Sequence, residues 1–249
     1  MKYKALFLDL DGTTIPNGID SFPSVRVTGA IRLAKDKIHV CLATGRPLYK
    51  AKYVIDHLDL SGLCVASGGT QIYDPVTKKI IKEIALSEET LPQIASVGDR
   101  YGIDYGIFNG NENIRYKKMT KRDVVLGIFF PKIIPDKVDE IELELHKIQN
   151  VSVHKMPSWE KGYIALDVID IHATKLHGIM TVQKLLHIKK NEIIGVGDSY
   201  NDFPLLMASG LKIAMGNAIP ELKSIADFIA PSVDEDGVAV VIEKFILHM

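Results

Sequence analysis

The chain has 249 residues, a formal net charge of −1 at pH 7 and a hydrophobic content of 47%. This length and composition allow one large or two modest globular domains with a sizeable core, and they exclude a disordered or fibrous protein. The balanced charge gives no general attraction to nucleic acid or to an anionic membrane, so neither is expected as a partner.

Apolar runs and cysteines bear on the compartment of the protein. No run approaches the roughly 20 apolar residues of a membrane span. The first residues lead directly into a strand pattern, without a signal-peptide cleavage region. Cys41 and Cys64 each lie inside an apolar segment, so a disulfide framework is not expected. We therefore expect a reduced, cytoplasmic protein.

Strand and helix patterns alternate in the first part of the chain. A short apolar run at residues 5–10 predicts a strand covered on both faces. The patterns that follow predict a helix over 27–36, a strand over 37–43, a helix over 47–58 and a strand over 63–66. This order predicts a doubly wound, mostly parallel α/β sheet with right-handed crossovers.

The pattern changes between residues 82 and 171. A helix start resembling a capping box lies at Ser87, and a charged amphipathic helix is predicted over 136–149. Shorter strand patterns lie at 105–108, 124–130, 151–154 and 163–168, and the run at 124–130 stops at Pro131. Helices mixed with short strands in this way are typical of an α+β insert.

After residue 171 the first pattern returns. It predicts helices over 172–187, 204–209 and 237–247, and strands over 192–197, 211–215 and 227–230. We therefore predict a Rossmann-like α/β core made of residues 1–81 and 172–249, interrupted by an inserted α+β domain at 82–171.

Two carboxylates lie where the first strand ends. Asp9 and Asp11 are two residues apart, so the strand period can aim both at one pocket. Ligands of open α/β sheets bind beyond the carboxyl ends of the strands. Carboxylates this close need a cation, or one of them is protonated. The alternative is a solvated turn, although an Asp in an apolar strand is costly to bury without a partner.

Other strand–loop junctions carry polar groups as well. Thr44 and Gly45 follow the second strand, where free backbone N–H groups at a helix start form an anion site; the alternative is an ordinary Thr cap. Lys175 lies near the start of the helix after the insert and is either a site cation or part of a solvated helix face. Asp198 and Asp202 bracket a turn that suits Mg²⁺ or, alternatively, caps the next helix.

Together these junctions resemble the haloacid dehalogenase-like superfamily, and within it the Cof-type phosphatases with a large inserted cap. The DxDGT motif is matched by residues 9–13, the second motif by 43–46 and the GDxxND motif by 197–202. Lys175 stands at the third motif. Two positions depart from the family pattern, because Gly68 stands in place of an asparagine and Leu176 in place of a glycine. Neither departure removes a core catalytic group of the family.

The resemblance implies an aspartyl-phosphate mechanism. Asp9 is the implied nucleophile, and Asp11 the implied general acid that then activates water. The implied phosphate-binding residues are Thr44, Gly45, Lys175 and Asn201. A covalent carboxylate intermediate divides one hard step into two, and phosphoryl transfer mainly asks for alignment and charge neutralisation.

The resemblance also implies a Mg²⁺ cofactor. Its ligands would be the Asp9 carboxylate, the Asp11 main-chain carbonyl and Asp198, with Asp202 and Asn201 supporting Lys175 and the waters of the metal. The metal would offset the repulsion between the nucleophile and the phosphate.

Substrate specificity is expected from Arg46, Lys117, Lys118 and Trp159. The two lysines belong to a basic stretch with Arg115, Lys121 and Arg122 that either binds an anionic part of the substrate or forms a solvated strand face. Trp159, the only tryptophan, either stacks on a substrate or anchors the insert.

The expected function is Mg²⁺-dependent hydrolysis of a small phosphorylated metabolite, with a sugar phosphate as substrate and a monomer or homodimer as the working form. A phosphohexomutase of the same superfamily is one alternative, and it would need a second phosphate site in the insert. A phospho-accepting signalling module is another, but such modules are shorter and their phosphorylated Asp follows a later strand.

Overall fold

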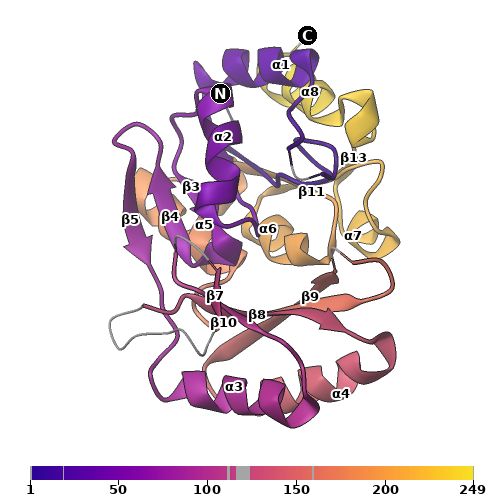
Figure 1. Ribbon diagram of the computed structural model, residues 1–249. Coiled ribbons are helices and arrows are strands. Elements are labelled where there is room, and N and C mark those ends of the chain that lie inside the picture. The colour runs from indigo at the N-terminus through magenta and orange to yellow at the C-terminus, as the bar shows by residue number, and fades with distance from the viewer. Residues whose placement is uncertain (1, 19, 111–112, 116–123, 159, 249) are drawn as a thin grey trace. The chain divides into compact units, whose positions relative to one another are not determined.

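The computed structural model describes residues 2–18, 20–110, 113–115, 124–158 and 160–248 (Figure 1). The chain divides into two compact units. The first consists of Met1–Lys82 and Lys175–Met249, and the second of Glu83–Thr174. Among the described residues, no helix is long and apolar enough to cross a membrane.

A parallel five-stranded sheet lies at the centre of the first unit, in the order β13-β12-β11-β1-β2. Its strands are β1 (Ala5–Leu8), β2 (His39–Leu42), β11 (Ile193–Gly197), β12 (Leu211–Ala214) and β13 (Phe228–Ile229). Every residue of β1 and β11 is buried, as expected for strands covered on both faces. The predicted α/β fold is confirmed.

Helices enclose this sheet and complete one hydrophobic core. They are α1 (Val25–Lys35), α2 (Leu48–Leu58), α5 (Lys175–Leu186), α6 (Phe203–Ala208), α7 (Pro220–Ser224) and α8 (Gly237–Ile242), which continues as a π-helical turn (Glu243–Leu247). Helix α1 packs against α8, and α5 against α6. Their inward residues join the strands in the same buried cluster.

The third strand predicted for the core has a different place. Strand β3 (Cys64–Ala66) meets the parallel sheet through a parallel bridge between Ala43 and Val65. It pairs antiparallel with β4 (Gln71–Asp74), which is followed in the same sheet by β5 (Lys79–Glu83). The chain reverses at residues 67–69, which all have positive φ. Two adjacent glycines make this turn feasible. The strand predicted at residues 63–66 is therefore confirmed, although its partner along its whole length is the antiparallel β4.

The second unit has its own sheet, in the order β7-β6-β8-β10-β9. The strands are β6 (Gly106–Phe108), β7 (Asn113–Arg115), β8 (Gly127–Ile133), β9 (Val151–Pro157) and β10 (Ile164–Asp170), and each neighbouring pair is antiparallel. Helices α3 (Thr90–Tyr101) and α4 (Pro135–His146) contribute to a separate hydrophobic core with this sheet. The predicted α+β character of the insert is confirmed.

Strand β8 continues through Pro131, where the sequence predicted its end. Its pairing with β10 shifts register between Leu166↔Phe130 and Ile164↔Ile133, so the proline lies at an irregularity in the ladder. The pairing with β6 ends at Phe129. Proline has no N–H to donate and is tolerated in a strand at such bulges and unpaired edges.

Candidate active site

Asp9 follows β1, the strand that lies between β2 and β11. The backbone N–H of Asp9 donates to the carbonyl of Val196 at 2.9 Å, and the Asp9 carbonyl accepts the hydroxyl of Thr14 at 2.6 Å. The residue is only 4% exposed. From β1 the chain continues to β2 on one side, and it later returns to β11 on the other side of β1. Open α/β sheets bind ligands at such a point, where the strand order reverses.

Lys175 forms the central ion pairs of the site. Its Nζ donates to Asp9 Oδ1 at 2.5 Å and to Asp202 Oδ1 at 2.6 Å, and its side chain is 3% exposed. Burial alone would lower the pKa of Lys175, but the carboxylates of Asp202 and Asp9 more than offset this and raise it. The two neighbouring carboxylates therefore favour the charged form of Lys175.

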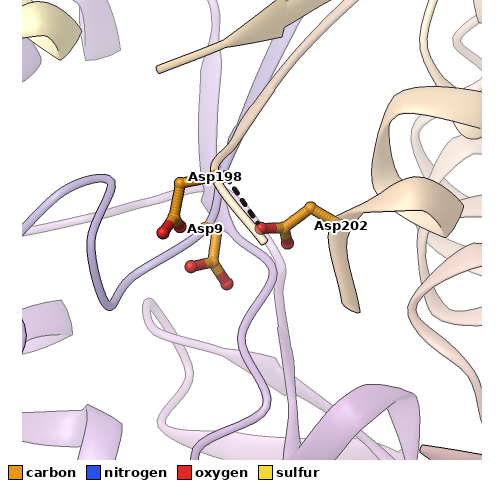
Figure 2. Close-up of side chains that lie close together, drawn as sticks. All are labelled: Asp9, Asp198 and Asp202. Carbon is orange, nitrogen blue, oxygen red and sulfur yellow. Dashed lines mark hydrogen bonds between the residues drawn. The ribbon is translucent and has the colours of Figure 1, made fainter. Parts of the chain in front are cut away.

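Three carboxylates converge beside this lysine. One oxygen from each of Asp9, Asp198 and Asp202 lies within 4.8 Å of the others, and Figure 2 shows the three side chains around a common space. Burial, and then repulsion from Asp202, hold the pKa of Asp9 well above its usual range and raise that of Asp198 to about 7. Three acids with one lysine lack positive charge, so the donor set fits a divalent cation.

The three carboxylates have different surroundings. Asp202 Oδ2 accepts hydrogen bonds from the backbone N–H groups of Asp198 at 2.9 Å and Ser199 at 3.1 Å, while Oδ1 accepts from Lys175. These contacts make Asp202 a support for the turn and the lysine. Asp9 and Asp198 are the better placed of the three to hold a metal.

Gly12 lets the loop after β1 approach Asp198. Its φ is +75°, and a Cβ there would lie 2.4 Å from Asp198 Oδ2. The neighbouring Thr13 hydroxyl donates to Asp198 Oδ1 at 3.0 Å. Asn217 Nδ2 donates to the Gly12 carbonyl at 2.8 Å, a contact that the sequence analysis missed. The sequence does carry a signal for this residue, because Asn217, like the other polar residues of the site, follows the end of a core strand, β12.

Thr44 and Gly45 lie in the loop after β2, and Asn201 follows β11. The Thr44 hydroxyl accepts the backbone N–H of Arg46 at 3.0 Å. Asn201 Nδ2 lies 3.5 Å from the position that a Gly45 Cβ would take. Asn201 Oδ1 is buried without a hydrogen-bond partner among the described residues. The structure therefore brings residues from both loops close to one another.

Asp11 and Arg46 contact each other. The guanidinium binds both carboxylate oxygens of Asp11, so this carboxylate is not part of the cluster of three acids. The remaining specificity candidates, Lys117, Lys118 and Trp159, lie outside the described residues.

The two departures from the family pattern also have structural settings. Gly68 has a φ of +69°, in the left-handed region that favours glycine. Leu176 is partly buried and packs against the core of the first unit.

A further perturbed carboxyl lies in the second unit, on β10. The neighbours of Asp167, Leu166 and Val168, lie in the core with α3 and α4, so strand alternation places Asp167 on the opposite face of the sheet. It lies opposite His154 in register. Burial raises the pKa of Asp167 to about 7.

Substitution of Asp167 should change how stability depends on pH. A folded-state pKa raised from 3.8 to about 7 means that stability is lost as the pH rises from about 4 to about 7. The Asp167→Asn variant should lack this loss. Its free energy of unfolding should therefore exceed that of the wild type by a larger amount at pH 8 than at pH 5. Urea denaturation at both pH values measures this. The control is Asp139→Asn, an exposed carboxylate on α4; equal pH profiles for wild type and Asp167→Asn would contradict the prediction.

The comparisons of this sequence with known proteins indicate one family. The sequence profile described as haloacid dehalogenase-like hydrolase matches residues 6–161 and 113–242. The chain is 25% identical to the 5-amino-6-(5-phospho-D-ribitylamino)uracil phosphatase YcsE of Bacillus subtilis and 26% identical to phosphoglycolate phosphatase 1 of Saccharolobus solfataricus. Both alignments cover 98% of this chain and 96% of the relative.

Solved structures share the fold. The phosphatase BT1666 of Bacteroides thetaiotaomicron, from the same superfamily, matches with a TM-score of 0.85 at 20% identity, over 98% of this chain and 95% of that one. The subclass IIB sugar phosphatase BT4131 matches with a TM-score of 0.80 at 20% identity, over 97% of this chain and 98% of that one.

Proposed function

Because the chain belongs to the haloacid dehalogenase-like hydrolase family and is a Cof-type phosphatase, we propose that it hydrolyses small phosphate monoesters with Mg²⁺ through an aspartyl-phosphate on Asp9. The observation that carries this proposal is the buried cluster at the end of β1. There, Lys175 contacts Asp9 at 2.5 Å and the carboxylate of Asp198 lies close by. A buried nucleophile flanked by a fixed cation suits phosphoryl transfer, which depends on alignment and charge neutralisation.

The reaction proceeds in two displacements. An Asp9 carboxylate oxygen attacks phosphorus while the ester P–O bond breaks, and the leaving alkoxide takes a proton from Asp11. Water then attacks the phosphorus of the aspartyl-phosphate and gives a proton to Asp11. The P–O bond to Asp9 breaks, and inorganic phosphate leaves.

Charge neutralisation comes from the first unit. Lys175 offsets the negative charge of Asp9 and of the phosphoryl group, and Thr44, the Gly45 amide and Asn201 hold phosphoryl oxygens. The Asp9 and Asp198 carboxylates and the Asp11 carbonyl would hold Mg²⁺, which when bound supplies the positive charge that the acidic cluster lacks.

Metal removal should abolish turnover. Exhaustive EDTA treatment should lower phosphate release from p-nitrophenyl phosphate to background, and Mg²⁺ should restore it. Ca²⁺ should inhibit, because it accepts more ligands than octahedral Mg²⁺ and can take both oxygens of Asp9. Full activity after chelation would contradict the metal assignment, and full activity with Ca²⁺ would contradict the role of coordination geometry.

A sugar or polyol phosphate is the proposed substrate class. Supporting this choice, one relative is named for a phosphoribityl compound, and a protein of the same fold is named a sugar phosphatase. We assign specificity to the inserted unit acting as a cap, with Lys117, Lys118 and Trp159 as candidate contacts. A hydrolysis screen of sugar, polyol and nucleotide phosphates and phosphoglycolate tests the class. Preference for phosphoglycolate or nucleotides would overturn it, and isomerised sugar phosphate without phosphate release would indicate a mutase.

The cytoplasm is the proposed compartment. Cys41 and Cys64 are both buried free thiols. Burial raises the pKa of Cys41 well above its usual range and that of Cys64 to about 12, so neither forms a reactive thiolate. Unpaired cysteines of this kind are usual in reducing compartments.

A further inference from the structure

All three guanidinium nitrogens of Arg46 donate hydrogen bonds to groups of the protein. Its Nε donates to Asp11 Oδ2 at 2.7 Å, and Nη2 donates to the other Asp11 oxygen. The same Nη2 donates to the carbonyl of Gly18 at 2.6 Å, and Nη1 donates to the Tyr53 hydroxyl at 3.1 Å. The Arg46 side chain is 8% exposed, against 32% for Asp11. This two-pronged ion pair therefore joins a fixed arginine to a partly exposed carboxylate.

Hydrogen bonds also hold the backbone of Arg46 and the side chain of its partner Tyr53. The backbone N–H of Arg46 donates to the Thr44 hydroxyl at 3.0 Å, and its carbonyl accepts the N–H of Ser67 at 2.8 Å. Tyr53, on α2, donates its hydroxyl to the carbonyl of Ser21 at 2.9 Å. The Tyr53 ring also lies edge-on to that of Phe22, with 5.0 Å between ring centroids. Loops that follow β1, β2 and β3 thus meet at Arg46, the first at its guanidinium and the last at its backbone carbonyl.

We propose that Arg46, braced by Tyr53, is a positioning residue that sets where the Asp11 carboxylate lies during proton transfer. The inference rests on the proposed role of Asp11 as general acid. Strand β1 ends at Leu8, so Asp11 lies in the loop that follows it, where the Arg46 guanidinium binds its carboxylate. A planar guanidinium bound to both oxygens fixes position and orientation together, which a lysine ammonium does not.

This role differs from the substrate contact expected for Arg46 from the sequence. A guanidinium that already donates to Asp11, Gly18 and Tyr53 is committed to holding the protein. Misplacing a proton-transfer group by about 1 Å lowers a rate by about a hundredfold. The loss should therefore appear in the step that needs the proton and leave substrate binding intact.

Leaving-group dependence tests this idea. The ratio kcat/KM covers steps up to release of the leaving group, and an alkyl alkoxide needs the proton of Asp11 far more than p-nitrophenolate does. For Arg46→Lys we expect kcat/KM to fall about a hundredfold on glycerol phosphate, through kcat and not KM, and only a few-fold on p-nitrophenyl phosphate. Tyr53→Phe should show the same pattern more weakly.

The matched control is Arg26→Lys. Arg26 forms a comparable two-pronged pair with Glu243 on the surface of the same unit, at 2.8 and 3.2 Å, and its substitution should leave both substrates unaffected. Unchanged melting temperatures of all variants would show that the fold is kept. If Arg46→Lys instead raises KM equally for both substrates, Arg46 contacts the substrate. That result overturns the inference.

A double-mutant cycle with Asp11→Asn separates the two levels of the argument. If Arg46 acts through Asp11, adding Arg46→Lys to Asp11→Asn should cost no further activity on glycerol phosphate. Additive losses would overturn the positioning role while leaving the proposed function in place. If Asp11→Asn itself slows both substrates equally in kcat/KM, Asp11 is not the general acid, and the proposed function fails at that residue together with the inference.

Discussion

The Asp9→Asn variant is expected to lose at least about a thousandfold in kcat on p-nitrophenyl phosphate, or roughly 4 kcal/mol of transition-state stabilisation. An amide is a poor nucleophile of nearly the same shape, and its oxygen can still accept the hydrogen bond from Lys175. The raised pKa of Asp9 reflects burial and repulsion from Asp202, so a neutral side chain should not lower the melting temperature. Phosphate release and thermal melting measure the two effects.

The control for this variant is Asp56→Asn, which removes an exposed carboxylate from α2. It should retain wild-type turnover. Activity of Asp9→Asn within tenfold of the wild type would exclude Asp9 as the nucleophile, whatever the state of the metal.

Removal of the Lys175 ammonium should affect both activity and stability. Lys175→Met leaves the buried carboxylates of Asp9 and Asp202 without their shared cation, and breaking such a pair costs about 3–5 kcal/mol. Turnover should fall on the order of a hundredfold to a thousandfold, because one fixed charge at the reacting group is lost. Urea denaturation without metal and phosphate release with Mg²⁺ measure the two losses.

A compensating substitution distinguishes the two roles of Lys175. Adding Asp202→Asn to Lys175→Met removes one unpaired carboxylate and should recover part of the stability without recovering turnover. Lys184→Met, an exposed lysine on the same helix, is the matched control and should change neither quantity. A Lys175→Met variant with wild-type stability would contradict the assigned ion pairs.

The composition of the candidate site could be predicted because its residues follow strands or begin the adjoining helix. All strands of a parallel sheet end at one edge, so residues after separate strands come together whatever the length of chain between them. Asp9 and Lys175 are 166 positions apart and are nonetheless 2.5 Å apart in space. The same rule would have indicated Asn217, which follows β12 and binds the Gly12 carbonyl.

Strand partners were harder to predict. The run at residues 63–66 has the apolar character of a core strand, but this character does not say which strand lies beside it. Its antiparallel partner β4 follows a reversal at residues 67–69. Likewise, the continuation of β8 through Pro131 depends on a register shift with β10, which has no counterpart in the periodicity of β8 itself.

By itself, the sequence determined the class of the fold, the insertion of one unit into another, and which residue types meet at the edge of the sheet. Only the tertiary structure decided where each side chain points. The strand period aims Asp11 at the same pocket as Asp9, yet its carboxylate binds Arg46, 35 positions away. Strand β1 ends at Leu8, and in the loop beyond it Asp11 is oriented by its charge-assisted contact with Arg46, which is a property of the folded molecule.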